Sequence, residues 1–235
     1  MSSTPLVALI TAGTAGLGAD TARLFAKSGI RVVVNYHSDT DRAFKLLDEL
    51  QTISPPELQK AFNFHCVKGD LSQKSDIINI VDETVACMGR LDVVFSNGGW
   101  TRLRDITDLD DNVDEEDWDR CFNMNGVFIT TASLAGVKFS GSSLAYAVTK
   151  AAQIHLAKGL ATIAAPKIRV NTVSPGLMLT DWGLQFPPER REEMRERTKL
   201  KRLPTTKDVA EQVLCFVKSK SVTGVNAVID GGMAL

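Results

Sequence analysis

Residues 6–29 of the chain read LVALITAGTAGLGADTARLFAKSG, and this stretch decides the fold. Its first part, residues 6–11, is a continuous apolar run ending in threonine, which is typical of a strand buried on both faces. A glycine-rich turn follows over residues 11–18, and an amphipathic helix is predicted from about residue 19 to residue 28. A strand, a glycine-rich turn and a helix in this order are the context in which such glycines bind phosphate.

The glycine-rich turn is expected to bind the pyrophosphate of a dinucleotide. Backbone amides at the helix N-terminus would face the pyrophosphate, and a side chain at Gly16 or Gly18 would block its approach. An ordinary strand-to-helix turn built from small residues would look the same, but the strand and helix units that follow agree with nucleotide binding. The cofactor-binding residues predicted in this turn are Gly13, Thr14, Gly16, Leu17 and Gly18.

The second predicted strand, residues 31–36 (RVVVNY), indicates which dinucleotide is bound. A dinucleotide fold that prefers NAD usually ends this strand with an acid for the ribose 2′-hydroxyl, and here no acid occurs before Asp39. A 2′-phosphate is therefore tolerated, and Thr14, His37 and Ser38 could hydrogen-bond it. We expect NADP rather than NAD, with Asn35, His37 and Ser38 on the cofactor, although no arginine stands at this tip.

Strands and helices alternate along the rest of the chain. Further strands are predicted at 62–67, 91–96, 168–173 and 225–229, and helices at 39–51, 77–88, 144–163 and 205–218. Residues 181–201 are predicted to be irregular and then helical, forming either a mobile lid over a pocket or a plain surface excursion. The alternation predicts an α/β fold with three layers, a doubly wound parallel sheet of Rossmann type, in a single domain spanning residues 1–235.

Small and polar residues follow the predicted strands at positions where a ligand would lie. Asp70, which ends the third strand and precedes Leu71, could accept a hydrogen bond from an adenine amino group or cap the helix that starts near Ser75. Two glycines after the fourth strand let a ligand lie against the backbone. The positions concerned are Asn97, Gly98 and Gly99, and after a later strand Pro175, Gly176, Leu177 and Thr180.

Composition excludes several functional classes. A net charge of −1 gives no reason to expect nucleic acid or an anionic membrane as a partner. The four cysteines are scattered without a pairable framework, which favours reduced thiols in a cytoplasmic protein, and the three histidines share no metal-ligand spacing. The N-terminal apolar run is too short for a membrane span and has no basic region before it. We therefore expect a soluble cytoplasmic protein without a metal.

Residues 133–150 (SLAGVKFSGSSLAYAVTK) carry the candidate chemistry. Tyr146 and Lys150 are four apart and so share one face of a helix. A free phenol titrates near ~10, and an ammonium ~4 Å away, worth up to ~4 kcal/mol at an effective dielectric of ~20, lowers such a pKa. This brings a phenol into range for general acid–base chemistry, and Ser133 could donate a hydrogen bond to the same reacting oxygen. The pair alone also fits a helix-face aromatic beside a solvated lysine.

Taken together, these motifs resemble the short-chain dehydrogenase/reductase family, and the resemblance runs from about Leu6 to Leu235. It implies an NADP(H)-dependent, ketoreductase-like enzyme that interconverts a ketone and a secondary alcohol by hydride transfer. Its substrate would be a small-molecule carbonyl or alcohol. The matching motifs are, in order, residues 11–18, Asp70-Leu71, Asn97-Gly98-Gly99, Ser133, Tyr146 with Lys150, Pro175-Gly176 with Thr180, and Asp230-Gly231-Gly232.

The resemblance also implies a role for each site residue. Tyr146 would donate the proton to the ketone, while Lys150 would lower the tyrosine pKa and bind the nicotinamide ribose. Ser133 would hold the carbonyl oxygen, and Asn125 would be a fourth catalytic residue in a water-linked proton relay to the lysine. The carboxamide of the nicotinamide would be held by Thr180, with the backbone near Leu177.

Three departures from the family pattern affect these expectations. Ala12 stands where the family usually has its first glycine, and residues 96–99 read SNGG instead of the usual NNAG. Only seven residues separate Asn125, at the end of a helix expected over 115–125, from Ser133, where the family places a whole helix before the serine-bearing strand. Residues 126–131 (GVFITT) are either that strand or the start of that helix, and their β-branched side chains favour the strand. One helix of the fold is then missing.

The shortened interval leaves two functions open, an active oxidoreductase or a catalytically impaired dinucleotide-binding protein. Members of the family are usually homo-oligomers that pack the missing helix and the 144–163 helix against a second subunit. We therefore expect this chain to be less stable than a full-length relative and poorly dimeric, with any association through the 205–218 helix and the last strand. A partly apolar or aromatic ketone is suggested as substrate by Trp100, Leu103, Trp182 and Phe186.

Overall fold

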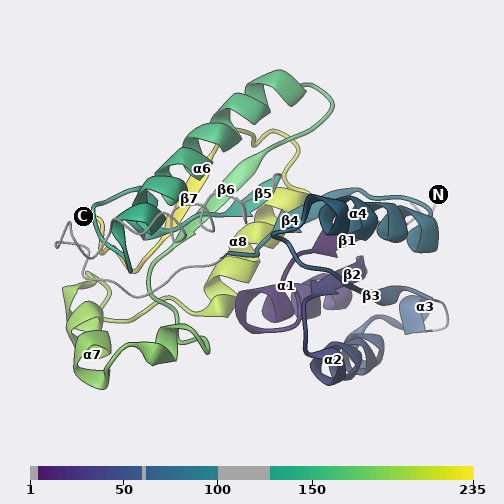
Figure 1. Ribbon diagram of the computed structural model, residues 1–235, viewed down its shortest axis with the longest axis horizontal. Helices are drawn as coiled ribbons and strands as arrows, with labels where there is room; N and C mark the ends of the chain where they lie inside the picture. Colours follow the sequence, from purple (N-terminus) through teal and green to yellow (C-terminus); the bar gives the residue numbers. More distant parts are fainter. Residues whose placement is uncertain (1–4, 60–61, 100–127) are drawn as a thin grey trace. The chain divides into compact units, whose positions relative to one another are not determined.

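The computed structural model describes residues 5–59, 62–99 and 128–235. The chain divides into two compact units, Met1–Gly98 and Gly99–Leu235, each with its own parallel strands and covering helices (Figure 1). The expectation of one domain over residues 1–235 stays a prediction. Asn125, Trp100, Leu103 and the helix expected at 115–125 lie outside the described residues.

The first unit is built on four parallel strands in the order β3-β2-β1-β4. Leu9 in β1 pairs with Val33 in β2 and with Val94 in β4, which fixes the register. The strands are β1 (Val7–Ile10), β2 (Arg31–Tyr36), β3 (Phe64–Lys68) and β4 (Val93–Ser96), and the helices are α1 (Gly16–Lys27), α2 (Thr40–Ile53), α3 (Pro56–Gln59) and α4 (Lys74–Met88).

Both faces of β1 and β2 are buried, as their continuous apolar runs predict. Val7, Leu9 and Val33 point to one face, where they form a core with Ile80 and Met88 of α4. Side chains alternate along a strand, so the intervening residues of β1 and β2 point to the opposite face. Figure 1 shows α4 on one side of these strands and α1 with α2 on the other. The first unit therefore has the expected three layers.

The second unit contains three parallel strands in the order β5-β6-β7. Ala157 and Ala161 of α6 pack with Val170, and the buried side chains of α8 include Val213 and Phe216. The strands are β5 (Ile129–Thr131), β6 (Asn171–Pro175) and β7 (Asn226–Ile229), the α-helices are α6 (Leu144–Ala164), α7 (Pro188–Arg197) and α8 (Thr206–Lys218), and the 3-10 turns are η2 (Leu134–Gly136) and η3 (Gly183–Gln185).

Most predicted elements are confirmed, although several boundaries differ by two or three residues and one short helix was not expected. The strand expected at 168–173 begins only at Asn171, because the Arg169 guanidinium donates to the carbonyls of Phe216 and Val217 and ties this segment to the end of α8. Helix α1 starts at Gly16, earlier than expected. Where Pro55-Pro56 predicted only a break, α3 begins, since proline is well tolerated in the first turn of a helix.

The segment before Ser133 is a strand, as its β-branched residues predict. Ile129–Thr131 forms β5 and pairs in parallel with β6, with Thr131 opposite Val173. Ala132 N then donates to the Val173 carbonyl at 2.8 Å, and Ser133 follows directly. The alternative, that residues 126–131 begin a helix and the strand is lost, is wrong for the described residues 128–131. Within the described part of the short interval before Ser133, residues 129–131 form the serine-bearing strand.

Candidate active site

Tyr146 and Lys150 lie together in the first two turns of α6. The helix begins there because the Ser143 hydroxyl caps it, accepting a hydrogen bond from Tyr146 N at 3.1 Å. Lys150 Nζ lies 5.5 Å from the centroid of the Tyr146 ring. The prediction that the two residues share one helix face is therefore confirmed.

Lys150 is a buried group rather than a solvated one, with 4% of its surface exposed. Its Nζ donates to the backbone carbonyl of Thr131 at 2.9 Å and to Gln153 Oε1 at 3.0 Å. An ammonium can be buried only if hydrogen bonds replace its water shell, and these two oxygens provide them. The interpretation of Lys150 as a solvated surface charge is wrong. The lysine instead joins the end of β5 to α6.

Ser133 lies in the turn that follows β5, and this turn packs on α6. Its hydroxyl oxygen caps η2 by accepting from Ala135 N at 3.1 Å, and a hydroxyl that accepts still has its proton to donate. At the end of η2, a Cβ at Gly136 would lie only 2.5 Å from the carbonyl carbon of Lys150. The turn carrying Ser133 therefore packs backbone to backbone on α6 at the lysine.

Gly99, one of the predicted cofactor-binding residues, belongs to the same neighbourhood. A Cβ built at Gly99 would lie 3.6 Å from Lys150 Nζ, which is ordinary contact distance. Ser133, Tyr146, Lys150 and Gly99 are thus gathered in the second unit, while Asn125 lies outside the described residues.

In the first unit, the glycine-rich turn has the backbone that its sequence predicts. Gly16 has a positive φ of 48°, and so does Ala12, at 47°. A Cβ at Gly18 would lie 2.5 Å from the Ala12 carbonyl oxygen, so glycine at this position is already required by the packing of the turn on itself. Helix α1 follows with Ala15 at its N-cap and no side-chain cap. Its first amides are therefore not bonded to a capping side chain, as an anion site requires.

Thr11 and Asn97 join the glycine-rich turn to the end of β4. Thr11 Oγ1 accepts from Asn97 N at 2.9 Å and from Gly98 N at 3.1 Å. Asn97 Nδ2 donates in return to the carbonyl of Ala12 at 3.3 Å. At Gly98 a Cβ would lie 2.2 Å from Leu71 Cδ1, which shows how closely Leu71 approaches the backbone there. The predicted residues of three strand ends therefore support one another.

Asn35 also holds the turn, and it does so from inside the protein. Only 1% of its surface is exposed. Its Oδ1 accepts from Ala12 N at 3.2 Å, and its Nδ2 donates to the carbonyl of Gly69 at 3.0 Å. A direct contact between Asn35 and a cofactor stays a prediction, whereas its structural link between the turn and the end of β3 is observed.

Asp70 does not cap the helix that follows it. The N-cap of α4 is Gln73, which makes no side-chain capping bond, so that alternative is wrong. The Asp70 carboxylate instead accepts from Ser72 N at 2.9 Å, and its Oδ2 lies 3.7 Å from His37 Nε2. Asp70 and His37, predicted separately, are therefore neighbours at the tips of β3 and β2.

A hollow of about 390 Å³ beside Thr14 contains an arginine that the sequence analysis missed. Arg42 lies in the first turn of α2, where Asp39 caps the helix by accepting from Arg42 N at 2.9 Å. Arg42 stands four residues beyond Ser38, so only the folding of α2 against α1 brings it near the glycine-rich turn. The hollow is lined by Thr14, Arg23, Asp39, Asp41, Arg42, Lys45, Leu46 and Glu49.

The segment after β6 is anchored at both ends. Gly176 N donates to the carbonyl of Ile229 at 2.9 Å, and Thr180 Oγ1 accepts from Gly183 N at 3.3 Å. The backbone near Leu177 is close-packed, since a Cβ at Gly183 would fall 1.9 Å from the Met178 carbonyl oxygen. The role of Thr180 toward a nicotinamide carboxamide stays a prediction.

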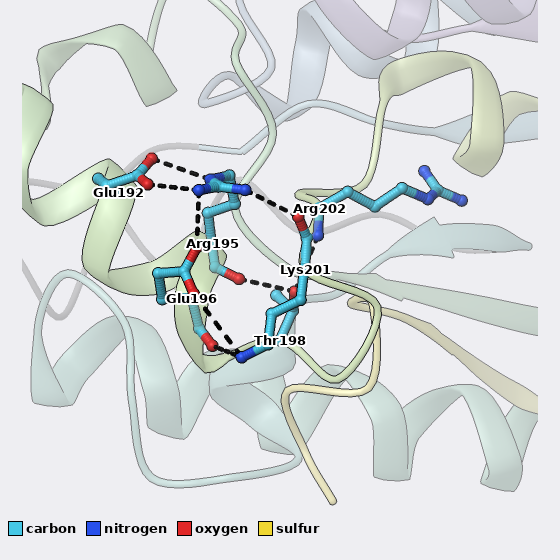
Figure 2. A network of polar contacts seen from close by, with 6 residues as sticks. All are labelled: Glu192, Arg195, Glu196, Thr198, Lys201 and Arg202. Atoms are coloured by element: carbon cyan, nitrogen blue, oxygen red, sulfur yellow. Dashed lines mark hydrogen bonds and ion pairs between the residues drawn. The ribbon is translucent and has the colours of Figure 1, made fainter.

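Residues 181–202 form a charged excursion with an aromatic pair at its start. Trp182 and Phe186 meet edge to face at 5.1 Å between ring centroids. Helix α7 has no buried residue, and its Arg195 pairs with Glu192 and Glu196 while also donating to the carbonyl of Lys201 (Figure 2). Hydrogen bonding to Arg195 lowers the pKa of the Glu192 carboxyl. These contacts are local, so both a lid and a plain excursion remain open for this segment.

Comparison with known proteins shows which family this chain matches, which the site geometry alone does not show. A family model described as short chain dehydrogenase matches residues 6–128, and one described as Enoyl-(Acyl carrier protein) reductase matches residues 120–234. A Streptomyces violaceoruber protein named as a ketoacyl reductase of the granaticin polyketide synthase is 32% identical, over 97% of this chain and 96% of its own. The 3-oxoacyl-[acyl-carrier-protein] reductase FabG of Staphylococcus epidermidis is 27% identical, over 96% and 98%.

Solved structures match nearly the full length of the chain. A 3-ketoacyl-(acyl-carrier-protein) reductase from Brucella melitensis complexed with NADH superposes with a TM-score of 0.83 at 24% identity, covering 98% of both chains. A short chain dehydrogenase from Burkholderia cenocepacia in complex with NADP gives 0.84 at 26% identity, covering 97% of both. The predicted fold class, a Rossmann-type α/β fold, is therefore confirmed.

The sequence alignments also show a difference in length between this chain and its relatives. They run over 251 residues for the Streptomyces protein and 249 for the Staphylococcus protein, whereas this chain has 235 residues. Both relatives therefore carry residues that have no counterpart here.

Proposed function

Since this chain belongs to the short-chain dehydrogenase/reductase family and is an NAD(P)-dependent oxidoreductase, we propose that it interconverts a ketone and a secondary alcohol with Tyr146 as the proton-transferring group. The observation that carries the proposal is the buried ammonium of Lys150, which lies 5.5 Å from the Tyr146 ring centroid. A positive charge there stabilises the phenolate that forms when the phenol gives up its proton.

In this proposal, the residues of the second unit have separate roles in ketone reduction. Tyr146 gives its proton to the carbonyl oxygen as that oxygen gains negative charge, and Ser133 donates a hydrogen bond to the same atom. Lys150 keeps its charge beside the ring because the oxygens of Thr131 and Gln153 replace its water. The hydride comes from the bound nicotinamide cofactor.

The first unit fits a dinucleotide on structural grounds. Gly16 has a positive φ of 48°, Gly18 lets the turn pack closely on itself, and the first amides of α1 have no side-chain cap. We propose NADP as the cofactor, because no acid occupies the tip of β2 and Thr14, His37 and Ser38 could hydrogen-bond a 2′-phosphate. Arg42, which lines the hollow beside Thr14 and pairs with Asp39 at 3.1 Å, is a further candidate to hold the 2′-phosphate.

The substrate is proposed to be a small carbonyl compound with an apolar part. Relatives named as ketoacyl reductases and the paired rings of Trp182 and Phe186 support this. Among the residues that the structure describes, no helix is long and apolar enough to cross a membrane. A cytoplasmic location is part of the proposal, because the four cysteines are scattered without a pairable framework.

A catalytically impaired dinucleotide-binding protein is the second candidate. It is favoured by the shortened interval before Ser133 and by the extra residues of the relatives. Loss of the helix that normally helps to pair subunits also keeps weak association part of the proposal, through α8 and β7. Stoichiometric NADPH binding without turnover of any carbonyl compound would select this candidate.

The test of the main proposal is NADPH oxidation against a panel of ketones, with Tyr146→Phe as the variant. The substitution keeps the ring and removes the proton donor, so turnover should fall by at least ~10²-fold, as expected for the loss of general acid catalysis. NADPH binding should persist. Near-normal turnover in Tyr146→Phe would remove Tyr146 from the mechanism.

His37→Asp tests the choice of cofactor. The new carboxylate would repel a 2′-phosphate, so the variant should bind NADH more tightly than NADPH, while the unmodified protein should prefer NADPH. Dissociation constants from the fluorescence of the reduced nicotinamide would show this. Tighter NADH binding by the unmodified protein would contradict the NADP proposal.

A further inference from the structure

Gln153 is a buried polar residue for which neither the motifs nor the family resemblance gives a role. Only 5% of its surface is exposed, and its Oε1 accepts the hydrogen bond from Lys150 Nζ at 3.0 Å. We propose that Gln153 is a positioning residue, a neutral acceptor that fixes the Lys150 ammonium in its place beside Tyr146. This inference rests on the proposed function of the Tyr146–Lys150 pair.

The position of Gln153 on α6 indicates that this side chain does more than fill space in the core. Beyond the lysine, the other buried residues of this helix face are Ala157 and Ala161. A buried amide costs free energy unless it is hydrogen-bonded, and an apolar side chain would fill the same space without that cost. The presence of glutamine one turn after Lys150, bonded to its ammonium, is therefore explained by the lysine and not by the core.

The two acceptors hold the ammonium from two different elements. Thr131 O belongs to the end of β5, and Gln153 Oε1 belongs to α6 itself. A lysine side chain is long and flexible, and one hydrogen bond would leave its nitrogen free to swing about that bond. Two bonds from separate elements fix it. The loss of Gln153 would remove the hydrogen bond that holds the Lys150 ammonium to α6.

The neutrality of both acceptors is equally important. An amide oxygen stabilises an ammonium without cancelling its charge, whereas a carboxylate at the same distance would neutralise the field acting on the phenol. The groups near Lys150 Nζ include the Tyr146 ring on the same helix, the Thr131 carbonyl at the end of β5, and Gly99. Gln153 therefore meets two requirements at once, hydrogen bonding and absence of charge.

The first experiment compares Gln153→Met with the unmodified protein in ketone reduction. Methionine keeps the length of the side chain and removes the acceptor, so kcat should fall about tenfold while KM for the ketone stays unchanged. The thermal midpoint should fall by only a few degrees, since one hydrogen bond to the buried ammonium is lost while the space stays filled. His155→Met, at an exposed position of the same helix, is the control and should keep its kcat. A kcat within twofold of the unmodified value in Gln153→Met would overturn the proposal.

The second experiment does not need turnover, so that failure of the proposed function can be told apart from failure of this inference. The chain has two tyrosines, so a Tyr36→Phe background leaves Tyr146 as the single phenol to follow by carbon-13 NMR during a pH titration. Gln153→Glu in that background should move the titration of Tyr146 to higher pH, because the added carboxylate cancels the lysine field. An unchanged midpoint would overturn the role of Gln153, whether or not the protein reduces ketones.

Discussion

Gly136→Ala is a sharp test of how the site is assembled, because it places one methyl group between η2 and α6. That methyl carbon would lie 2.5 Å from the carbonyl carbon of Lys150, 2.7 Å from Ala151 N and 2.8 Å from the Lys150 carbonyl oxygen. All three are backbone atoms of a helix, and none can rotate away as a side chain would. Either the turn carrying Ser133 or the start of α6 must therefore move.

The magnitude follows from these distances. Overpacking a well-packed interior by one methyl group usually costs about 1–3 kcal/mol, and contacts with three backbone atoms put this case near 3 kcal/mol. For a chain of this length each kcal/mol lowers the melting temperature by about 2–4 °C, so we expect a decrease of about 6–12 °C. Because the shift separates Ser133 from the lysine helix, turnover should fall by up to about 10²-fold.

Gly159→Ala is the matched control, with the same substitution in the same unit. Nothing lies within 4 Å of a Cβ at Gly159, which is exposed in the interior of α6. Alanine is a better helix former there by about 1 kcal/mol, so this variant should be stabilised. Denaturant unfolding and ketone reduction would be measured on both variants. If Gly136→Ala is as stable and as active as the unmodified protein, η2 does not pack on α6 as described.

Three further predictions concern other parts of the chain. Ala12→Gly should stabilise the protein by about 0.5–1 kcal/mol, because the left-handed φ of 47° costs alanine about 1–2 kcal/mol and the greater entropy of unfolded glycine offsets part of the gain; a loss of stability in denaturant melts would contradict this. Asn35→Ala should lower the free energy of unfolding by about 2–4 kcal/mol, because the Ala12 amide and the Gly69 carbonyl lose this partner. NADPH binding should weaken as well, and unchanged binding would show that the glycine-rich turn keeps its conformation without Asn35. The hydrogen bond from Arg202 lowers the pKa of Asp208 to about 2, below its unfolded value near 4, so this group stabilises the fold above pH ~4 and the contribution disappears as the pH falls toward 2; Asp208→Asn should lose about 1 kcal/mol at pH 7 and little near pH 2, and an equal loss at both would refute the assignment.

Local patterns in the sequence predicted the elements whose causes are local. The capping box of α8 is an example, because Thr205 and Asp208 stand at the required spacing and both of its hydrogen bonds form. The four-residue spacing of Tyr146 and Lys150 placed them on one helix face for the same reason. The apolar runs of β1 and β2 fixed their burial, since side chains on both faces of a strand must be covered.

Contacts between distant segments could not be predicted in the same way. No sequence motif at Thr11 predicts its hydrogen bonds to Asn97 and Gly98, which lie 86 and 87 residues away along the chain. Asn35 was predicted on a cofactor because it stands at a strand tip, yet its side chain is buried and bonded to backbone from two other segments. In both cases the partners are backbone groups. Almost every residue type carries the same backbone groups, so the residue identities do not reveal these hydrogen bonds.

The same reasoning explains how a chain that is predicted to lack a helix before Ser133 can keep the geometry of its lysine. Lys150 is held from the sheet side by the carbonyl of Thr131, a backbone group whose place depends on the register of β5 and not on its side chain. That register is set by pairing with β6, which is present and parallel. The strand is therefore the part of this region that the site requires, and the seven residues after Asn125 are enough to supply it. The helix that the sequence predicts to be missing would have covered the sheet and offered a surface to a second subunit, so its loss would affect stability and assembly before it affects the position of Lys150.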